Sequence, residues 1–321
     1  MVVDREYRGA ADALADPRIR LPSPLEEVDD EFLAGRGVRL WLKRDDLIDT
    51  DIPGNKWRKL RYNLAGARAA GHDVLLTFGG AYSHHIAATA AAGHRYGFTT
   101  IGVIRGERHL PLNPMLARAA EQGMRLTYLD RATYRRKTDP DVIDRLRAMY
   151  GRFQLIPEGG SNTAGVRGCR ELGAELVSQI RPDLVCCPVG SGGTLAGLAA
   201  GVDGVPTLGV CVLRGDGFMD EVVEDLQVKA FGGRSGDWQI AYGHHHGGYA
   251  KRSGELDDFI DDFAVRHRLV LEPVYVAKML HAVHRLVADG RVRAKRIVAV
   301  VTGPAVQFSP RSSRSNRRVA R

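Results

Sequence analysis

The sequence predicts an α/β fold built on open, mostly parallel β-sheet flanked by helices, and two patterns support this prediction. Short runs of β-branched or apolar residues, which are typical of strands, alternate with longer segments of helical composition. Strands that alternate with helices form βαβ units, whose neighbouring strands run parallel. In addition, a chain of 321 residues has the length of about two domains.

The elements that carry these patterns are named here by residue range. The expected strands span 74–78, 99–104, 125–129, 153–156, 184–189, 207–213 and 296–301. The expected helices span 57–71, 84–97, 114–123, 164–180 and 274–290, and a helix of small residues follows the strand that ends at Val189. Most of the strands are separated by one of these helices, as βαβ units require.

Two glycine-containing turns, 53–56 and 158–162, mark the expected domain boundaries. The segment between them contains about four of the strands with their helices, which is enough for a small α/β domain. We therefore expect a large domain formed by residues 1–58 and 162–309. Residues 59–161 form a small domain inserted into it.

The net charge of +8, from 46 Lys and Arg against 38 Asp and Glu, would permit a nucleic-acid partner. Five arginines and no acid lie in the last twelve residues, 310–321, so the rest of the chain has 41 basic against 38 acidic residues. The body of the protein is close to neutral, and we expect no nucleic-acid partner. We expect the tail to be disordered and solvated, with RNA contact or anchoring as the alternative.

Membrane association and disulfide bonding are not expected. No stretch approaches the ~18 apolar residues of a membrane span, and the first twenty residues carry acids and lack a signal-peptide core. The four cysteines, Cys169, Cys186, Cys187 and Cys211, show no CxxC spacing. We interpret them as small buried hydrophobes in a reducing compartment, the cytoplasm, rather than as a metal or redox site.

The glycine-rich loop after the strand that ends at Val189 is the first candidate site. Gly190, Gly192 and Gly193 allow close backbone approach, and Ser191 supplies a hydroxyl. The free amides of the helix that begins here form an anion site, which fits a phosphate.

Thr194 adds a second hydroxyl to this loop. Two well-known phosphate-binding motifs do not match the loop. The dinucleotide fingerprint needs glycine where the chain has Leu195, and the GK[ST] of a P-loop is missing. A tight strand–helix turn without a ligand therefore remains the alternative.

A lysine that follows a Pro–Gly turn is the second candidate. Lys56 lies where the chain enters a helix, and both the helix dipole and the nearby cations Arg58 and Lys59 disfavour its charge. Its pKa is therefore expected to be low, and a neutral amine is what a Schiff base requires. The alternative is a solvated basic helix face.

A second glycine turn, 77–93, leads from a strand into an alanine-rich helix. Tyr82 and Ser83 supply hydroxyls at this helix start, which suits a substrate carboxylate. His84 and His85 follow, and their alternative role is capping and packing. Neighbours on a helix lie about 100° apart around its axis, so the pair is poorly placed to bind a metal.

Three further segments near the C-terminus carry polar side chains. His244, His245 and His246 precede Tyr249 in a glycine-rich stretch; they suggest a metal, but no acid or cysteine lies close in sequence, and we expect no metal. Tyr275 lies at a helix start. Thr302 follows the last strong strand, and catalytic groups of α/β sheets gather at such strand ends.

The ordered motifs KRDD…GNKWRKL, GGAYSHH, PEGGSN, VGSGGT, GGYAK, EPVY and VTG resemble one family. It is the 1-aminocyclopropane-1-carboxylate deaminase and D-cysteine desulfhydrase family, whose members use pyridoxal phosphate. The resemblance spans about residue 20 to 305. It implies the tryptophan synthase β-subunit-like fold (fold type II), with two twisted, mostly parallel sheets and the large domain binding the cofactor.

The resemblance also implies roles for single residues. Lys56 matches the lysine that forms the Schiff base. The catalytic residues that it implies are Lys56, Ser83, Tyr249 and Tyr275. The cofactor-binding residues that it implies are Asn55, Lys56, His84, Gly190, Ser191, Gly192, Gly193, Thr194 and Thr302.

The activity implied is that of a lyase or deaminase which releases a 2-oxo acid and ammonia from a small amino acid. The resemblance further implies a homodimer. Three positions depart from the family pattern: His84 replaces the usual asparagine, Pro304 replaces a glycine, and Val276 stands where relatives have Glu or Thr. A non-catalytic relative that binds the cofactor or a phosphorylated ligand is therefore the alternative.

Overall fold

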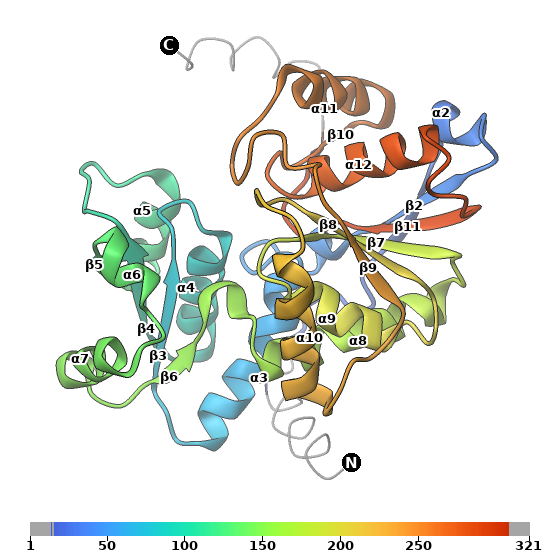
Figure 1. Cartoon of the computed structure of the whole chain (residues 1–321). Coiled ribbons are helices and arrows are strands. Elements are labelled where there is room, and N and C mark those ends of the chain that lie inside the picture. Colours follow the sequence, from blue (N-terminus) through green and yellow to red (C-terminus); the bar gives the residue numbers. More distant parts are fainter. Residues whose placement is uncertain (1–13, 15, 308–321) are drawn as a thin grey trace.

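The computed structural model describes residue 14 and residues 16–307. Its larger half contains a six-stranded sheet, drawn at the right of Figure 1. Along the sheet the strands are β1 (Leu25–Val28), β2 (Arg39–Lys43), β11 (Arg296–Val300), β7 (Leu184–Val189), β8 (Thr207–Cys211) and β9 (Trp238–Ala241). Only β1 is antiparallel to its neighbour within this sheet.

The smaller half, at the left of Figure 1, contains a four-stranded parallel sheet. Its strands are, in order along the sheet, β5 (Arg125–Leu129), β4 (Thr99–Arg105), β3 (Val74–Gly79) and β6 (Gln154–Ile156). A short antiparallel pair, β10 (Leu269–Val270) and β12 (Val306–Gln307), lies apart from both sheets. The predicted α/β fold with two mostly parallel sheets is confirmed.

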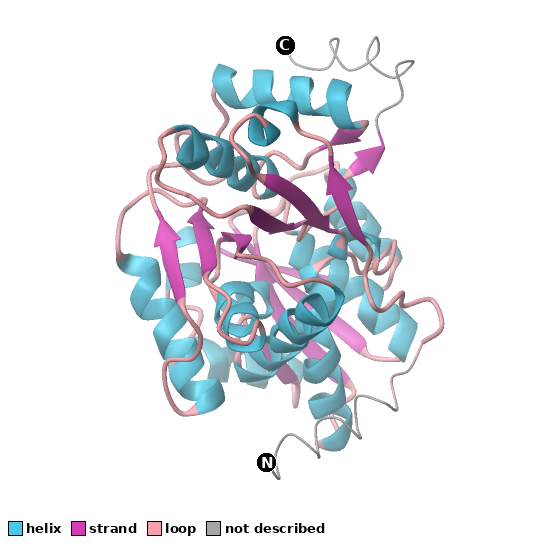
Figure 2. Cartoon of the chain, turned by 90° about the vertical axis from the view of Figure 1, so that its right-hand side faces the viewer, coloured by secondary structure: helices cyan, strands magenta, loops and turns pink. Residues whose placement is uncertain are grey.

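Helices cover both sides of the strands, as the view of Figure 2 shows. In the smaller half they are α4 (His84–Tyr96), α5 (Pro114–Glu121), α6 (Arg131–Arg135) and α7 (Pro140–Tyr150). In the larger half they are α2 (Glu31–Ala34), α8 (Thr163–Gln179), α9 (Gly193–Gly201), α10 (Phe218–Phe231), α11 (Gly254–His267) and α12 (Val276–Ala288). The helix α3 (Asn55–Ala69) and the short 3₁₀ turns η1 (Asp45–Leu47) and η2 (Glu158–Gly160) complete the elements.

The core of the larger half lies on the two faces of its sheet. One hydrophobic cluster joins the sheet to α11 and α12, and the other joins it to α8, α9 and α10. Cys186 belongs to the first cluster and Cys187 to the second, so these adjacent side chains point to opposite faces of β7. All four cysteines are free and buried, as expected.

The seven predicted strands are present, but β1, β2 and β9 were not among those predicted. Their sequences, LEEV, RLWLK and WQIA, mix charged or polar residues with apolar ones. They lie at or next to the edges of the sheet, where a strand does not need a continuous apolar run. Residues 310–321, predicted to be a disordered tail, lie outside the described residues, and the predicted domain boundaries remain a prediction.

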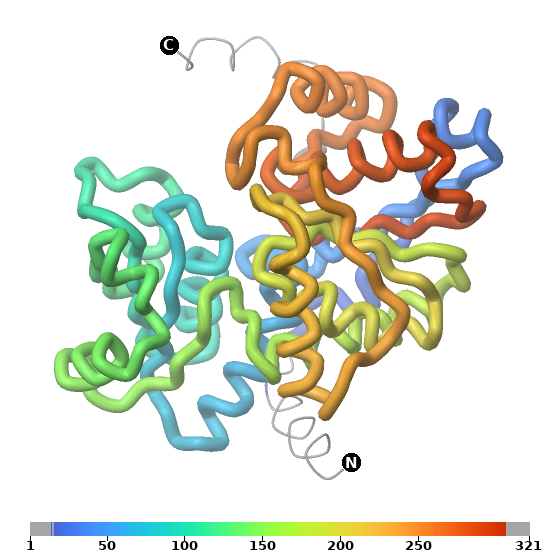
Figure 3. The backbone as a smooth tube through the Cα atoms, viewed as in Figure 1, coloured from blue at the N-terminus to red at the C-terminus, as the bar shows by residue number. Residues whose placement is uncertain are grey.

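The chain crosses between the two halves through adjacent segments. It leaves the larger half through α3 and returns after β6, as Figure 3 traces, and α3 packs against α8. Gly168 of α8 permits this contact, because a Cβ atom there would lie 1.9 Å from the carbonyl oxygen of Arg58. The two helices therefore pack backbone to backbone beside the crossing.

A methyl group at this contact is expected to destabilise the protein. Gly168→Ala should lower the free energy of unfolding by about 1–3 kcal/mol, because the helices must separate to admit it. Urea unfolding measures this change. Gly233→Ala is the control, since no atom lies within 4 Å of the added Cβ. Equal stability of the two variants would contradict the close packing of α3 and α8.

Candidate functional site

The start of α3 lies against the segment that follows β11. Gly54 has a φ of 66°, and a Cβ atom there would lie 2.1 Å from the carbonyl oxygen of Thr302. The amide of Asn55 donates a hydrogen bond of 3.3 Å to the same oxygen. Only glycine tolerates both the backbone conformation and the contact. This turn brings Lys56, at the second position of α3, next to Thr302.

Lys56 has no ion-pair partner among the described residues. Its Nζ donates to Oδ1 of Asn55 at 2.9 Å. Burial and the nearby amine of Lys59 lower the pKa of Lys56 to about 7. A large fraction of this amine is therefore neutral near neutral pH, which is the state required for attack on an aldehyde.

The cause of the low pKa of Lys56 differs in part from the predicted cause. Burial contributes most to the low pKa of Lys56, and Lys59 contributes as expected. The expected contribution of Arg58 is wrong, because its guanidinium pairs with Asp45 and Glu175 at 2.9 Å each. The negative charges of Asp45 and Glu175 offset the charge of the guanidinium, so it repels Lys56 little.

The glycine loop between β7 and α9 forms a cradle of backbone amides. Gly192 has a φ of 78°, and α9 begins at Gly193 without a side-chain cap. A Cβ atom on Gly193 would lie 2.6 Å from Oγ of Ser161. Thr194 accepts a hydrogen bond of 2.8 Å from Nδ2 of Asn55, which connects this loop to the start of α3. The uncapped helix start leaves amides available to an anion.

Lys59 is a site residue that the sequence analysis did not nominate. Its Nζ donates to Oγ of Ser161 at 3.0 Å and to the carbonyl oxygen of Gly159 at 3.1 Å, and it lies 3.5 Å from Oγ of Ser191. Burial lowers its pKa. The sequence contains one indication of this role, the spacing of Lys59 from Lys56. A residue three positions after Lys56 lies on the same face of the helix.

The two adjacent histidines have different surroundings. Burial and nearby Lys56 lower the pKa of His84 to about 4, so its ring is neutral near neutral pH. His85 points into the small half, where Nε2 lies 2.8 Å from Oγ1 of Thr77. That hydroxyl donates to the carbonyl oxygen of Ile156, so the imidazole must donate to it. The packing role left open by the sequence fits His85.

Ser83 is the N-cap of α4. Its Oγ accepts a hydrogen bond of 3.3 Å from the amide of Ile86, and the helix that it begins has 13 residues. The free amides of the first turn lie at this helix start. Tyr82, by contrast, is 73% exposed and turns away from the protein.

The hydroxyls of Tyr249 and Tyr275, the two tyrosines named as candidates from the sequence, are close to each other. Tyr275 lies at the N-cap position of α12, and its hydroxyl is 3.3 Å from that of Tyr249. A Cβ atom on Gly190 would lie 3.0 Å from the ring of Tyr275, so the ring packs on the glycine loop. Burial and the neighbouring Tyr249 raise the pKa of Tyr275. The hydroxyl of Tyr275 is therefore protonated near neutral pH.

Glu272 was also not nominated. Its carboxylate accepts from the amides of Val274 at 2.7 Å and Tyr275 at 2.8 Å, which fixes the backbone that presents the tyrosine. Lys278 supports Tyr249 in the same way, because its Nζ donates to the carbonyl oxygen of Gly248 at 2.8 Å.

The histidine stretch lies against α12. Nδ1 of His246 lies 2.8 Å from Oγ of Ser253, and its ring is 4.8 Å from that of His281. The described part of the chain contains no group of three His, Cys, Asp or Glu side chains that could hold a metal ion.

The length and the apolar character of a helix decide whether it can span a membrane. Among residues 14 and 16–307, no helix combines the length and the apolar character needed to cross a bilayer.

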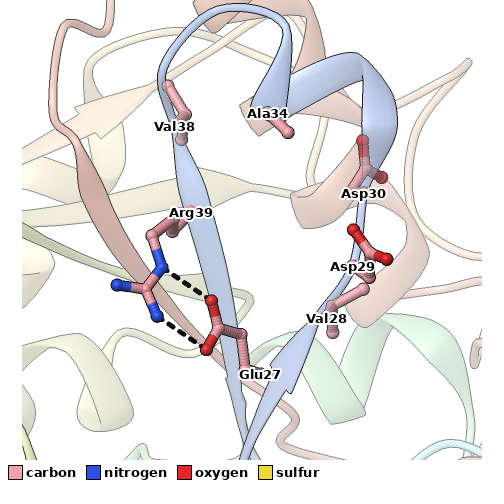
Figure 4. Close-up of a pocket in the computed structure, with 7 residues that line it drawn as sticks. All are labelled: Glu27, Val28, Asp29, Asp30, Ala34, Val38 and Arg39. Carbon is pink, nitrogen blue, oxygen red and sulfur yellow. Dashed lines mark hydrogen bonds and ion pairs between the residues drawn. The ribbon is translucent and has the colours of Figure 1, made fainter.

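A surface hollow of about 340 Å³ lies elsewhere, between β1, α2 and the start of β2 (Figure 4). Glu27 and Arg39 form an ion pair of 2.7 Å beside it. Arg39 begins β2, whereas Thr302 follows the end of β11, which runs parallel to β2. The hollow and the lysine site therefore lie at opposite ends of these strands.

Comparison with known proteins assigns the chain to a family. The family model described as "Pyridoxal-phosphate dependent enzyme" matches residues 19–303. A protein of Thermotoga maritima, provisionally named 1-aminocyclopropane-1-carboxylate deaminase, is 32% identical over 282 residues, 83% of this chain and 89% of that one. The D-cysteine desulfhydrase of Salmonella typhi is 29% identical over 82% of this chain and 86% of its own.

A solved structure agrees with these sequence relatives. The crystal structure of an ACC deaminase homologue superimposes with a TM-score of 0.77 at 26% identity, covering 93% of this chain and 94% of that one. The chain therefore belongs to the pyridoxal-phosphate dependent enzyme family, and its fold is the fold type II, tryptophan synthase β-subunit-like fold.

The residues present fit pyridoxal phosphate. The cradle at Gly192 and Gly193 has no room for side chains, and the buried amine of Lys59 beside it has only neutral partners. A phosphate would supply the missing negative charge. Lys56, a second buried amine, is in the state required to react with an aldehyde.

The buried amine of Lys56 should leave a signature in the pH dependence of stability. Its pKa of about 7 in the folded protein lies below the reference value of 10.5, so burial of the charge destabilises the folded state most below about pH 7. Lys56→Met should therefore raise the free energy of unfolding of the cofactor-free protein near neutral pH. The gain should shrink as the pH rises toward 10.5.

Denaturant unfolding at several pH values measures this gain. Lys251→Met, which removes an exposed lysine, controls for the loss of a positive charge. A gain that stays constant over the whole pH range would show that Lys56 is not a buried cation.

Proposed function

We propose that this protein is a pyridoxal-phosphate-dependent lyase or deaminase of a small amino acid, of the D-cysteine desulfhydrase or 1-aminocyclopropane-1-carboxylate deaminase type. The products are a 2-oxo acid and ammonia. The observation that carries the proposal is the buried amine of Lys56, with a pKa of about 7, beside a glycine cradle suited to a phosphate. The relatives named for these two activities support it.

The cofactor would be held from two directions. Lys56 would bind its aldehyde, and the amides and hydroxyls of residues 190–194 would bind its phosphate together with the amine of Lys59. Asn55, which joins Lys56 to Thr194 through hydrogen bonds, would hold the two ends at a set distance. His84 and Thr302 would flank the ring.

The substrate would lie between the helix start of α4 and the tyrosine pair. The first-turn amides of α4 and the hydroxyl of Ser83 are suited to the α-carboxylate. The hydroxyls of Tyr249 and Tyr275 lie 3.3 Å apart. They can donate a proton to a leaving group or to a carbon of the substrate's cyclopropane ring.

Pyridoxal phosphate, when bound, withdraws electrons from the carbon that carries the amino group of the substrate. The protein must then move protons. Lys56 is suited to this role because its pKa of about 7 lets the amine accept a proton and return it near neutral pH. The raised pKa of Tyr275 keeps its hydroxyl protonated, so it can act as a donor.

The departures from the family pattern leave these groups in place. Val276 is fully buried in the core cluster under α12 and offers no hydrogen bond to a cofactor ring. His84 is a neutral ring that can still donate one hydrogen bond. The preserved lysine, cradle and tyrosine pair favour an active enzyme over the non-catalytic alternative.

The proposal predicts release of a 2-oxo acid from at least one small amino acid. Purified protein loaded with pyridoxal phosphate would be supplied with D-cysteine, D-serine, 3-chloro-D-alanine and 1-aminocyclopropane-1-carboxylate. Lys56→Ala should abolish both the release of the 2-oxo acid and the visible absorption band of the bound cofactor, because the amine that binds the aldehyde is gone.

Lys59→Gln is the matched variant, one helical turn away. It retains Lys56, so it should bind the cofactor more weakly and regain turnover at high cofactor concentration. Wild-type protein that binds the cofactor but turns over none of the four amino acids would overturn the proposed lyase or deaminase function. Loss of activity in Lys59→Gln that excess cofactor does not restore would contradict the phosphate-binding role.

We further propose that the enzyme acts as a homodimer in the cytoplasm. The resemblance to the family supports the dimer, and the four free, buried cysteines fit a reducing compartment. Light scattering coupled to size-exclusion chromatography should give twice the mass of 35.1 kDa. A mass of one chain at micromolar concentration would contradict the dimer.

A further inference from the structure

A group of charged side chains at the carboxyl edge of the four-stranded sheet has no role in the chemistry described above. Arg105 is the last residue of β4, Tyr134 lies on α6, and Glu158 begins η2 after β6. Lys137 follows α6 and forms an ion pair of 3.3 Å with Glu158. In α/β sheets, ligands bind at this edge.

Arg105 is the cation of this group that has no anionic partner. Its guanidinium forms no hydrogen bond or ion pair with any described residue, whereas Lys137 is paired with Glu158. Its Nη2 would lie 3.6 Å from a Cβ atom on Gly80, which begins the loop that leads to Ser83. An unpaired guanidinium thus lies beside the loop that ends at the start of α4.

The exposed guanidinium of Arg105 lies over the ring of Tyr134. The Cζ atom of Arg105 lies 6.0 Å from the centre of the Tyr134 ring, and Nζ of Lys137 lies 5.0 Å from it. The ring is only 2% exposed and meets Phe78 of β3 edge-on at 6.0 Å. Cation–π attraction to this buried ring favours the position of both cations.

The same edge lies beside the glycine loop of the larger half. The hydroxyl of Tyr134 is buried without a hydrogen-bond partner. Burial and the nearby Glu158 raise its pKa, with a smaller contribution from Tyr249. Gly159, next to Glu158, lies close to the glycine loop, because a Cβ atom on it would be 2.7 Å from Oγ of Ser191. The group therefore borders the substrate position.

We propose that Arg105 is a substrate-binding residue whose guanidinium binds a carboxylate of the amino-acid substrate beside Gly80. This inference rests on the proposed function, because it places a further contact in the same site. An arginine fork pairs with a carboxylate through two parallel hydrogen bonds, which a helix start alone does not provide. The carboxylate is either the α-carboxylate or a second one on the substrate side chain.

Ligand titration of the holoenzyme tests the proposal. D-Alanine, with one carboxylate, and D-aspartate, with two, are titrated while the absorption of the bound cofactor is followed. Arg105→Gln should raise the Kd by roughly tenfold or more, since a hydrogen bond to a charged group is lost. A loss for both ligands assigns Arg105 to the α-carboxylate, and a loss for D-aspartate alone assigns it to the side-chain carboxylate.

Two further variants separate binding from folding. Arg105→Lys keeps the charge but loses the fork, so its Kd should lie between those of the wild type and Arg105→Gln. Arg108→Gln removes an exposed arginine of the next loop and should leave both Kd values unchanged. All three variants should keep the melting temperature and the cofactor affinity of the wild type.

The outcomes also separate this inference from the function on which it rests. Equal Kd values for wild type and Arg105→Gln, with both ligands bound, would overturn the role of Arg105 alone. Wild-type holoenzyme that binds neither ligand and turns over no amino acid would overturn the proposed function, and this role with it.

Discussion

The site around Lys56 depends on a network of buried ion pairs near the start of α3. Arg58 pairs with Asp45 of η1 and Glu175 of α8, and Glu175 also pairs with Lys43 of β2 at 2.5 Å. Burial disfavours the charge of Glu175, but Arg58 and Lys43 outweigh it and lower its pKa to about 2. Removal of one partner from such a network typically costs about 3–5 kcal/mol, because a buried charge is left alone.

This network ties α3 to three elements of the larger half, and its effect reaches the site through helix geometry. Lys56 lies two positions before Arg58 and Lys59 one position after it, and both amines bind neutral partners instead of acids. The acids thus neutralise the arginine and leave the two lysines unpaired. The same turn of helix therefore supplies a rigid anchor through Arg58 and two amines whose pKa values are lowered by burial.

Groups suited to bind an anion lie on both halves of the molecule. In the larger half, an uncapped helix start and Lys59 surround the glycine loop. In the smaller half, Ser83 caps a helix start next to Gly80, where the guanidinium of Arg105 lies. A ligand with a phosphate at one end and a carboxylate at the other matches this distribution of charge. The net charge of the chain is a poor guide to it, because the relevant potential is local.

Local sequence determined much of this protein. The seven apolar strands, the glycine turns and the polar residues that follow them were readable, because hydrophobic runs and glycines act over a few neighbouring positions. The loops that carry Lys56, Ser83, Tyr249 and Tyr275 were readable in this way, whereas the catalytic roles proposed for these residues came from the family resemblance. Tertiary structure alone decided the partners of Arg58, since Glu175 lies 117 residues away, and brought Lys59 to Ser161, 102 residues on. No local pattern encodes such contacts; they arise when α3 packs on α8 and the two sheets present their strand ends to one another.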